Sequence, residues 1–92
     1  SRGLGDVYKR QLHGGIITTI MDISMGHLIK NEQSAGTTLE LKVNFMSAIK
    51  HEKIKCIGSF LKKGRTISTL DSKLFREDGK LAAYATSTWK IL

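Results

Sequence analysis

Backbone amides and one carboxylate, all within a single apolar segment, are the groups of this sequence most suited to chemistry. Gly14 and Gly15 follow His13 and open the segment, and Asp22 is its only charged residue before Lys30. The first amides of a helix lack intrahelical partners and lie at the positive end of its dipole, so they stabilise a developing negative charge. A carboxylate in apolar surroundings is costly unless it is hydrogen-bonded or used as a base or nucleophile. The two features predict a site that polarises a carbonyl oxygen and attacks its carbon, directly or through water.

The spacing of these groups limits how such a site can form. Asp22 lies eight residues beyond Gly14, which is about 11 Å, or two turns, along one helix. Both groups of one chain therefore cannot touch the same carbonyl group. We expect Gly14 of one subunit and Asp22 of another to meet across a dimer interface.

Structural roles for the same residues remain open from spacing alone. The glycines can form a turn before the helix, and His13 can be a capping or core histidine. Asp22 can belong to a structural network held by neighbouring hydroxyl groups, which are those of Thr18, Thr19 and Ser24. A metal site is not expected, because His27 and His51 lack a second ligand at metal spacing and Cys56 is the only cysteine.

The segment that carries these groups has the composition of a buried helix from 14 to about 31. Its apolar residues cover most of a helical circumference, and a helix that is apolar on nearly all sides is normally buried. These residues are Ile16, Ile17, Ile20, Met21, Ile23, Met25, Leu28 and Ile29. Isoleucine and threonine lower helix propensity, so burial by the rest of the fold must stabilise this helix.

The remaining chain is typical of β-structure. Residues 38–45 alternate, which predicts a half-buried strand with Leu39, Leu41, Val43 and Phe45 on its apolar face. Further strands are expected at about 52–61, 66–76 and 80–92, with turns at 63–64 and at the hairpin dipeptide 78–79. The predicted fold is α+β: one long buried helix on a four-strand antiparallel meander. The helix-facing residues should also include Ile54, Cys56, Phe60, Ile67, Leu70, Leu81 and Trp89.

The length and net charge of the chain limit the classes of protein to which it can belong. The chain has 92 residues and a net charge of +7, which fits one small domain that gains from self-association. No apolar stretch reaches the length of a membrane span, and no signal segment opens the chain, so we expect a cytoplasmic protein without membrane contact. The lysines are scattered and are not interleaved with aromatic residues, which does not favour a nucleic-acid partner.

Several motifs in one register resemble the hotdog-fold acyl-CoA thioesterases of the PaaI group, within the 4-hydroxybenzoyl-CoA thioesterase-like superfamily. The motifs are the tripeptide 13–15, an apolar helix with Asp22 nine residues after His13, the alternating strand 36–46, the Gly-Arg turn 62–65 and the hairpin 78–82. The resemblance covers residues 12–92 and implies one hotdog domain there. Residues 1–11 lack periodicity and resemble translated adapter sequence, so we expect them to be foreign to the fold and the domain to be truncated at its N-terminus.

The resemblance also implies roles for individual residues. The Gly14 amide would polarise the thioester carbonyl, and Asp22 of the facing subunit would be the general base or nucleophile. Thr38 would help to place the attacking water, and His13 would orient the helix start. The substrate would be bound by residues of the helix start and of the basic turn, the latter holding the coenzyme A phosphates: Gly15, Lys62, Lys63, Gly64 and Arg65.

The partners implied are an acyl-CoA substrate and further copies of the chain, as a homodimer or homotetramer. No separate cofactor is expected, since coenzyme A arrives as part of the substrate. The family usually has asparagine about six positions before the histidine, where this sequence has Val7. This departure keeps open a non-catalytic hotdog protein that binds acyl-CoA. The positive charge keeps open a small basic nucleic-acid-binding domain, which is the less favoured alternative. The acyl group itself cannot be assigned from sequence.

Overall fold

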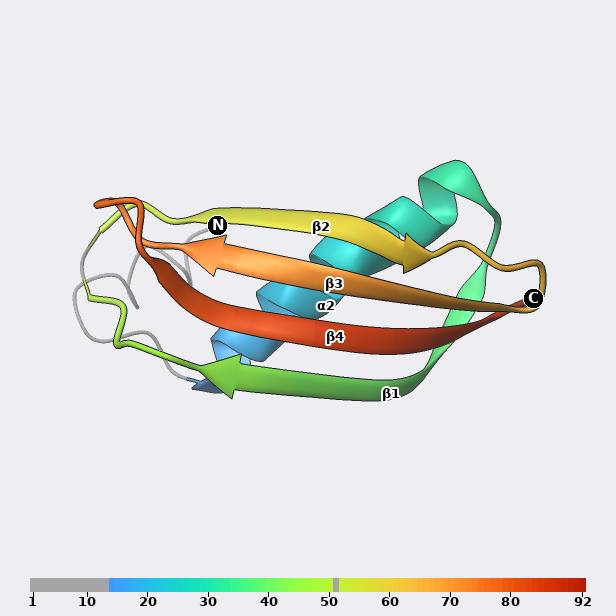
Figure 1. Cartoon of the computed structure of the whole chain (residues 1–92), viewed down its shortest axis with the longest axis horizontal. Coiled ribbons are helices and arrows are strands. Elements are labelled where there is room, and N and C mark those ends of the chain that lie inside the picture. Colours follow the sequence, from blue (N-terminus) through green and yellow to red (C-terminus); the bar gives the residue numbers. More distant parts are fainter. Residues whose placement is uncertain (1–13, 51) are drawn as a thin grey trace.

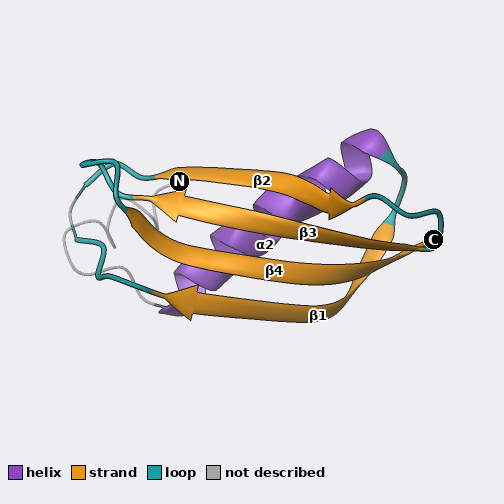
Figure 2. Ribbon diagram, viewed as in Figure 1, coloured by secondary structure: helices purple, strands orange, loops and turns teal. Residues whose placement is uncertain are grey.

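The computed structural model describes residues 14–50 and 52–92, so the segment 1–11, Val7, His13 and His51 lie outside the described residues. One helix lies across a four-strand antiparallel sheet, in two layers (Figures 1 and 2). The elements are α2 (Gly14–Glu32), β1 (Gly36–Phe45), β2 (Lys55–Lys62), β3 (Ile67–Phe75) and β4 (Leu81–Ile91). The predicted class, one helix on an antiparallel sheet, is confirmed.

Helix α2 is held to the sheet by one line of side chains. Ile17, Met21, Met25 and Ile29 recur every four residues and are all buried. The helix runs diagonally across the sheet, from the end of β1 toward the end of β2 (Figure 2). The prediction of burial on nearly all sides is wrong for this chain, because the single sheet covers one side and Ile23 is 54% exposed. No helix in the described ranges is long and apolar enough to cross a bilayer.

The strand order is β1-β4-β3-β2, which corrects the predicted meander. Strands β2, β3 and β4 do follow one another through tight turns, and Gly79 at φ 86° allows the predicted hairpin. Strand β1 pairs with β4 instead of β2. The physical reason is the connection 46–54, which is too long for a tight hairpin and buries Ile49 completely.

A β-bulge at Leu39 changes which residues of β1 face the helix. The pairing with β4 shifts between Thr38 and Glu40, so Thr38 lies opposite Trp89. Directly paired residues share one face of a sheet, and the Trp89 ring lies against the helix at Gly26. Thr38 is therefore on the helix side, whereas Leu39 is 56% exposed. The alternation in the sequence had predicted the reverse, with Leu39 on the helix side and Thr38 on the outer face.

The core confirms most of the other predicted positions. Leu70 and Trp89 are buried, and the partly buried residues packed on them include Leu41, Val43, Ile54, Cys56 and Phe60. Ile67 was predicted to face the helix but pairs with the exposed Lys90 and is itself exposed. Phe45 pairs with Ala83 and lies near Gly14 of the helix, although its side chain is 52% exposed. The sequence interpretation missed the small residues Ala83 and Ala85 of β4, which are fully buried and lie in register with the helix-facing residues of the neighbouring strands.

Candidate active site

Gly14, at the first turn of α2, opens onto a cavity. The cavity has a volume of about 340 Å3 and is lined by Gly14, Ile17 and the segment 45–49 that follows β1. A Cβ added at Gly14 would lie 3.6 Å from Phe45 Cζ, an ordinary contact, whereas one at Gly64 would lie 2.0 Å from the Ile67 carbonyl oxygen. Packing within the described chain thus does not require glycine at 14, and the space there is open to a ligand.

The electrostatics of this helix start favour a partial negative charge on that ligand. The first amides of α2 carry no intrahelical bonds, and they lie at the positive end of the helix dipole. The first turn contains no acidic side chain that would occupy this end. A carbonyl oxygen that gains charge during reaction would therefore be stabilised in the Gly14 cavity.

Asp22 lies two turns further along α2 and is half-buried. Its Oδ1 atom is buried and has no hydrogen-bond partner within the described chain. The hydroxyl groups that could have held it bond elsewhere: Thr18 to the Gly14 carbonyl oxygen at 2.9 Å, Thr19 to that of Gly15 at 2.9 Å, and Ser24 to that of Met21 at 2.8 Å. None of these three hydroxyl groups therefore holds Asp22 in a structural network, as the alternative interpretation required.

Gly14 and Asp22 do not form one site within a single chain. The helix is continuous between them, which puts about 11 Å between the two residues along its axis. Asp22 does not line the Gly14 cavity. The single chain thus agrees with the expected division of the site between two subunits but does not test it, since it contains one copy.

The other expected site residues lie at different places. Thr38 is half-buried beside Trp89, and Gly15 is exposed on the first turn of α2. His13 lies outside the described residues. Within the described ranges no three histidine, cysteine, aspartate or glutamate side chains come together as a metal site.

The basic turn lies at the opposite end of α2 from Gly14. Lys62, Lys63, Gly64 and Arg65 connect β2 to β3 next to the helix end, where the side-chain amide of Gln33 donates to the Gly64 carbonyl oxygen at 2.7 Å. The helix of 19 residues separates this turn from Gly14 of the same chain by roughly 28 Å. Asp22 lies between the two ends.

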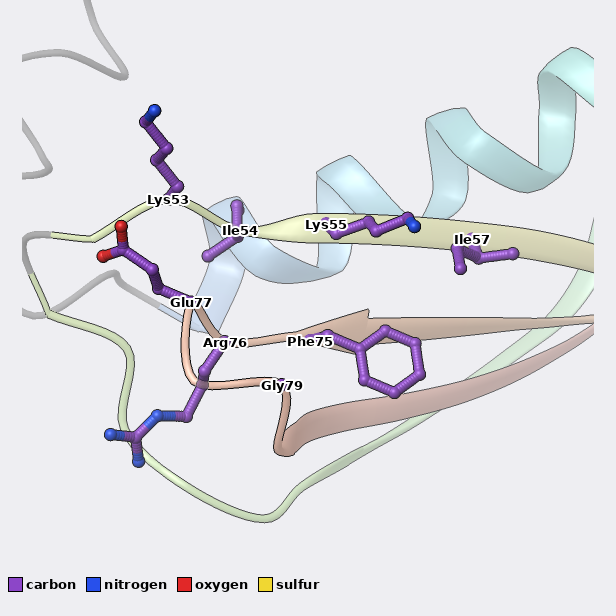
Figure 3. Close-up of a pocket in the computed structure, with 8 residues that line it drawn as sticks. All are labelled: Lys53, Ile54, Lys55, Ile57, Phe75, Arg76, Glu77 and Gly79. Atoms are coloured by element: carbon purple, nitrogen blue, oxygen red, sulfur yellow. The ribbon is translucent and has the colours of Figure 1, made fainter.

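Another cavity is not near this chemistry. It has a volume of about 510 Å3 and lies at the start of β2 and the end of β3 (Figure 3). Its lining is Lys53, Ile54, Lys55, Ile57, Phe75, Arg76, Glu77 and Gly79. Arg76 already pairs with Glu52 and Asp78. Neither Gly14 nor Asp22 lines this cavity. The candidate active site is therefore placed at Gly14 and Asp22, whose groups are suited to thioester chemistry.

A second carboxylate, Asp71 on β3, contrasts with Asp22 because both of its oxygens are bonded. Oδ1 accepts a hydrogen bond from Ser59 at 2.5 Å and Oδ2 accepts one from the Tyr84 hydroxyl at 3.1 Å. This hydrogen bond, together with burial and the negative charge of Asp71, raises the pKa of Tyr84 above 10.0. Asp71 is thus a structural carboxylate, and Asp22 is the one left available.

The wall of the Gly14 cavity was not predicted from the sequence. Phe45, which the alternation assigned only to the apolar face of its strand, lines this cavity. Ser47, whose buried Oγ has no partner within the described chain, and Ile49 belong to that wall. The connection after β1 mixes apolar and polar residues without a regular period, so its sequence carries no signal for this wall.

The chain was compared with protein families and curated proteins. The model of the thioesterase superfamily matches residues 11–83. A proposed esterase of Saccharolobus solfataricus is 37% identical over 83 residues, which are 88% of this chain and 59% of that protein. The chain thus spans less than two thirds of the length of this relative.

Solved structures similar to this one include two proteins whose names refer to thioesterases. A hypothetical thioesterase protein from Streptococcus pneumoniae TIGR4, solved with coenzyme A, is 26% identical with a TM-score of 0.85 over 91% of this chain and 68% of that chain. Variants of that protein with an aspartate or a threonine replaced by alanine, sixteen positions apart, have also been solved. Zebra fish thioesterase superfamily member 2 is 31% identical with a TM-score of 0.80 over 89% of this chain and 62% of that chain.

Proposed function

Because the chain belongs to the thioesterase superfamily and has its hotdog fold, we propose that it is an acyl-CoA thioesterase, which hydrolyses a thioester to a free acid and coenzyme A. The observation that carries the proposal is the buried Oδ1 of Asp22, which has no partner within the described chain. A carboxylate oxygen that is buried without a partner is costly, and a role as a base explains why it is there. The Streptococcus pneumoniae protein solved with coenzyme A supports the class of substrate.

In the proposed reaction, the Gly14 amide donates a hydrogen bond to the thioester carbonyl oxygen. The Asp22 carboxylate accepts a proton from water as the water oxygen bonds to the carbonyl carbon, and the negative charge that develops on the carbonyl oxygen is stabilised by Gly14. When the tetrahedral intermediate collapses, the carbon–sulfur bond breaks and the proton passes to the leaving sulfur. Direct attack by Asp22, with a covalent intermediate that water then hydrolyses, is the other version of this chemistry.

Thr38 is the residue we propose for placing the attacking water. It lies sixteen positions after Asp22, which is also the separation of the aspartate and threonine that were replaced by alanine in the Streptococcus pneumoniae structures. The bulge that turns Thr38 to the helix side of β1 supports this role, because a residue on the outer face could not approach a site on the helix.

We propose that two copies of the chain build each site, as a homodimer or a homotetramer. Strand β1 is an edge strand and its exposed backbone groups can pair with another copy. The exposed side chains of Leu39 and Phe45 on this strand support the same edge as an interface. Gly14 of one copy and Asp22 of its partner would then approach one thioester.

Hydrolysis of a panel of acyl-CoA thioesters, measured as thiol release, tests the proposed function. Asp22→Asn keeps the shape of the side chain and removes the base, so kcat should fall by about 10²- to 10⁴-fold with little change in KM. Asp78→Asn, the same substitution in the exposed hairpin, is the matched control and should behave as the wild type. Equal rates for the wild type and Asp22→Asn would exclude this mechanism. Saturable coenzyme A binding without any hydrolysis would instead select the non-catalytic alternative.

Mixing two inactive variants tests whether the site is shared between chains. Gly14→Pro removes the amide hydrogen of the first helical residue, where proline is well tolerated. In a random mixture with Asp22→Asn, half of the dimers are mixed and each of these has one intact site, so about a quarter of the wild-type activity should return. If Gly14 and Asp22 act within one chain, mixing restores no activity.

A further inference from the structure

Ser47 is the polar part of the wall of the Gly14 cavity. Among the described residues that line this cavity, Ser47 alone carries a polar side chain. The amides of Met46 and Ser47 both donate to the Ala82 carbonyl oxygen, at 2.8 and 3.2 Å, and Ile49 is completely buried two residues further on. The backbone at Ser47 is therefore fixed by β4 on one side and by the core on the other.

The hydroxyl group of Ser47 has no function within the fold of one chain. Its Oγ atom is buried and has no hydrogen-bond partner within the described residues. The hydroxyl groups of the fully buried serines on β3, Ser68 and Ser72, are both hydrogen-bonded. Buried polar groups normally have a partner, and one without a partner is costly. An unpaired hydroxyl in the wall of a cavity is thus available to an acceptor on a ligand.

From this arrangement we infer that Ser47 is a second hydrogen-bond donor to the thioester carbonyl oxygen, alongside the Gly14 amide of the same chain. The inference rests on the proposed function, because that oxygen belongs to the same substrate. A serine hydroxyl reorients by rotation about a single side-chain bond, so an oxygen that enters the cavity can accept from it without a shift of the backbone.

Two donors from different elements suit the charge that develops in the reaction. The Gly14 amide comes from the start of α2 and the Ser47 hydroxyl from the segment after β1, and both border one cavity. A carbonyl oxygen has two lone pairs and can accept from both groups. The bonds strengthen as the oxygen becomes negative in the tetrahedral intermediate, and a donor shielded from water is effective in this role. Ser47 should therefore affect kcat more than KM.

The kinetics and stability of Ser47 variants test this inference. Ser47→Ala should lower kcat for thioester hydrolysis by about 10²-fold with little change in KM, and Ser47→Thr, which keeps the hydroxyl, should recover most of the rate. The Tm of Ser47→Ala should equal or exceed that of the wild type, because the hydroxyl has no partner to lose. Ser59→Ala is the matched control with the opposite result, a lower Tm and an unchanged kcat, since Ser59 bonds Asp71 outside this cavity.

Mixed dimers test whether Ser47 acts together with Gly14 of its own chain. Ser47→Ala co-expressed with Asp22→Asn should regain about a quarter of the wild-type activity, because each mixed dimer has one intact site. Ser47→Ala co-expressed with Gly14→Pro should regain none, since each site then lacks one of the two donors.

Three results would overturn the inference. One is a wild-type kcat in Ser47→Ala when Asp22→Asn has lost activity, which would leave the proposed function intact. Another is recovery of activity when Ser47→Ala is mixed with Gly14→Pro, which would place the two residues in different sites. The third is a loss of kcat that comes with a lower Tm and is not recovered in Ser47→Thr, which would make the hydroxyl structural. A wild-type protein that hydrolyses no thioester would instead contradict the proposed function itself.

Discussion

Replacing Asp22 by alanine is expected to stabilise the protein while it removes activity. The buried Oδ1 has no hydrogen-bond partner within the described chain, and a buried polar group without a partner costs about 1–3 kcal/mol. Alanine also has the higher helix propensity, by up to about 0.7 kcal/mol. Some packing is lost with the carboxylate, so the free energy of unfolding should rise by about 1–2 kcal/mol.

The assay combines thermal unfolding with thioester hydrolysis. For a domain of this size, each 1 kcal/mol corresponds to a shift of roughly 4–8 °C in Tm, so the Asp22→Ala variant should unfold at a clearly higher temperature. Its hydrolysis rate should fall to the background. Gains in stability from removing a functional group are the usual sign of a residue kept for activity.

Asp71→Ala is the matched control for this prediction. The Asp71 carboxylate is bonded by Ser59 and Tyr84, so its removal leaves two hydroxyl groups without their acceptor and should lower the free energy of unfolding by about 1–3 kcal/mol. The reasoning would be refuted if Asp22→Ala were less stable than the wild type, or if it kept wild-type turnover. Equal destabilisation by both substitutions would make Asp22 a second structural carboxylate.

Three further predictions follow from the same structure. Gly14→Pro should leave Tm within a few degrees of the wild type and lower kcat by about 10²- to 10³-fold, because it removes the oxyanion donor; Gly14→Ala keeps the amide hydrogen and should lose less. Gly64→Ala should lower the free energy of unfolding by about 2 kcal/mol in urea titrations, since its Cβ would meet the Ile67 carbonyl oxygen; an unchanged midpoint would contradict this. The raised pKa of Tyr84 favours the protonated hydroxyl in the folded state, so its stabilising contribution is complete below about pH 10 and is lost as the pH rises through the folded pKa. Wild-type stability should therefore fall more steeply above pH 10 than that of Tyr84→Phe, and parallel curves would contradict the assignment.

Local patterns predicted the elements of this fold because local physics determines them. The apolar segment from Gly14 formed a helix, and the dipeptide 78–79 formed the hairpin because Gly79 takes a positive φ. The strand order could not be obtained in this way. Pairing of β1 with β4 goes with a long connection in which Ile49 is completely buried by contacts with the rest of the fold.

The side of the sheet on which Thr38 lies shows why the register of a strand is harder to predict than its position in the sequence. A single extra residue, Leu39, shifts the pairing with β4 and exchanges the two faces for the first part of β1. No residue type in the strand marks this bulge. The hydrogen bonds that Gln33 makes with Gly64 and Ser68 are equally invisible in the sequence, because these residues are far apart along the chain and meet only when the end of α2 lies against the turn.

The part of the helix prediction that failed bears on the candidate site. The sequence of α2 is apolar on more sides than one sheet covers, and Ile23 remains exposed. Apolar side chains on the uncovered side of a helix lower the free energy when another surface covers them. Asp22 is the neighbour of Ile23 on this helix and points about 100° away from it, so a surface that covers both Ile23 and this flank of the helix would also reach the carboxylate. A second copy would supply such a surface together with its own Gly14, which is why we expect stability and catalysis to depend on the same association.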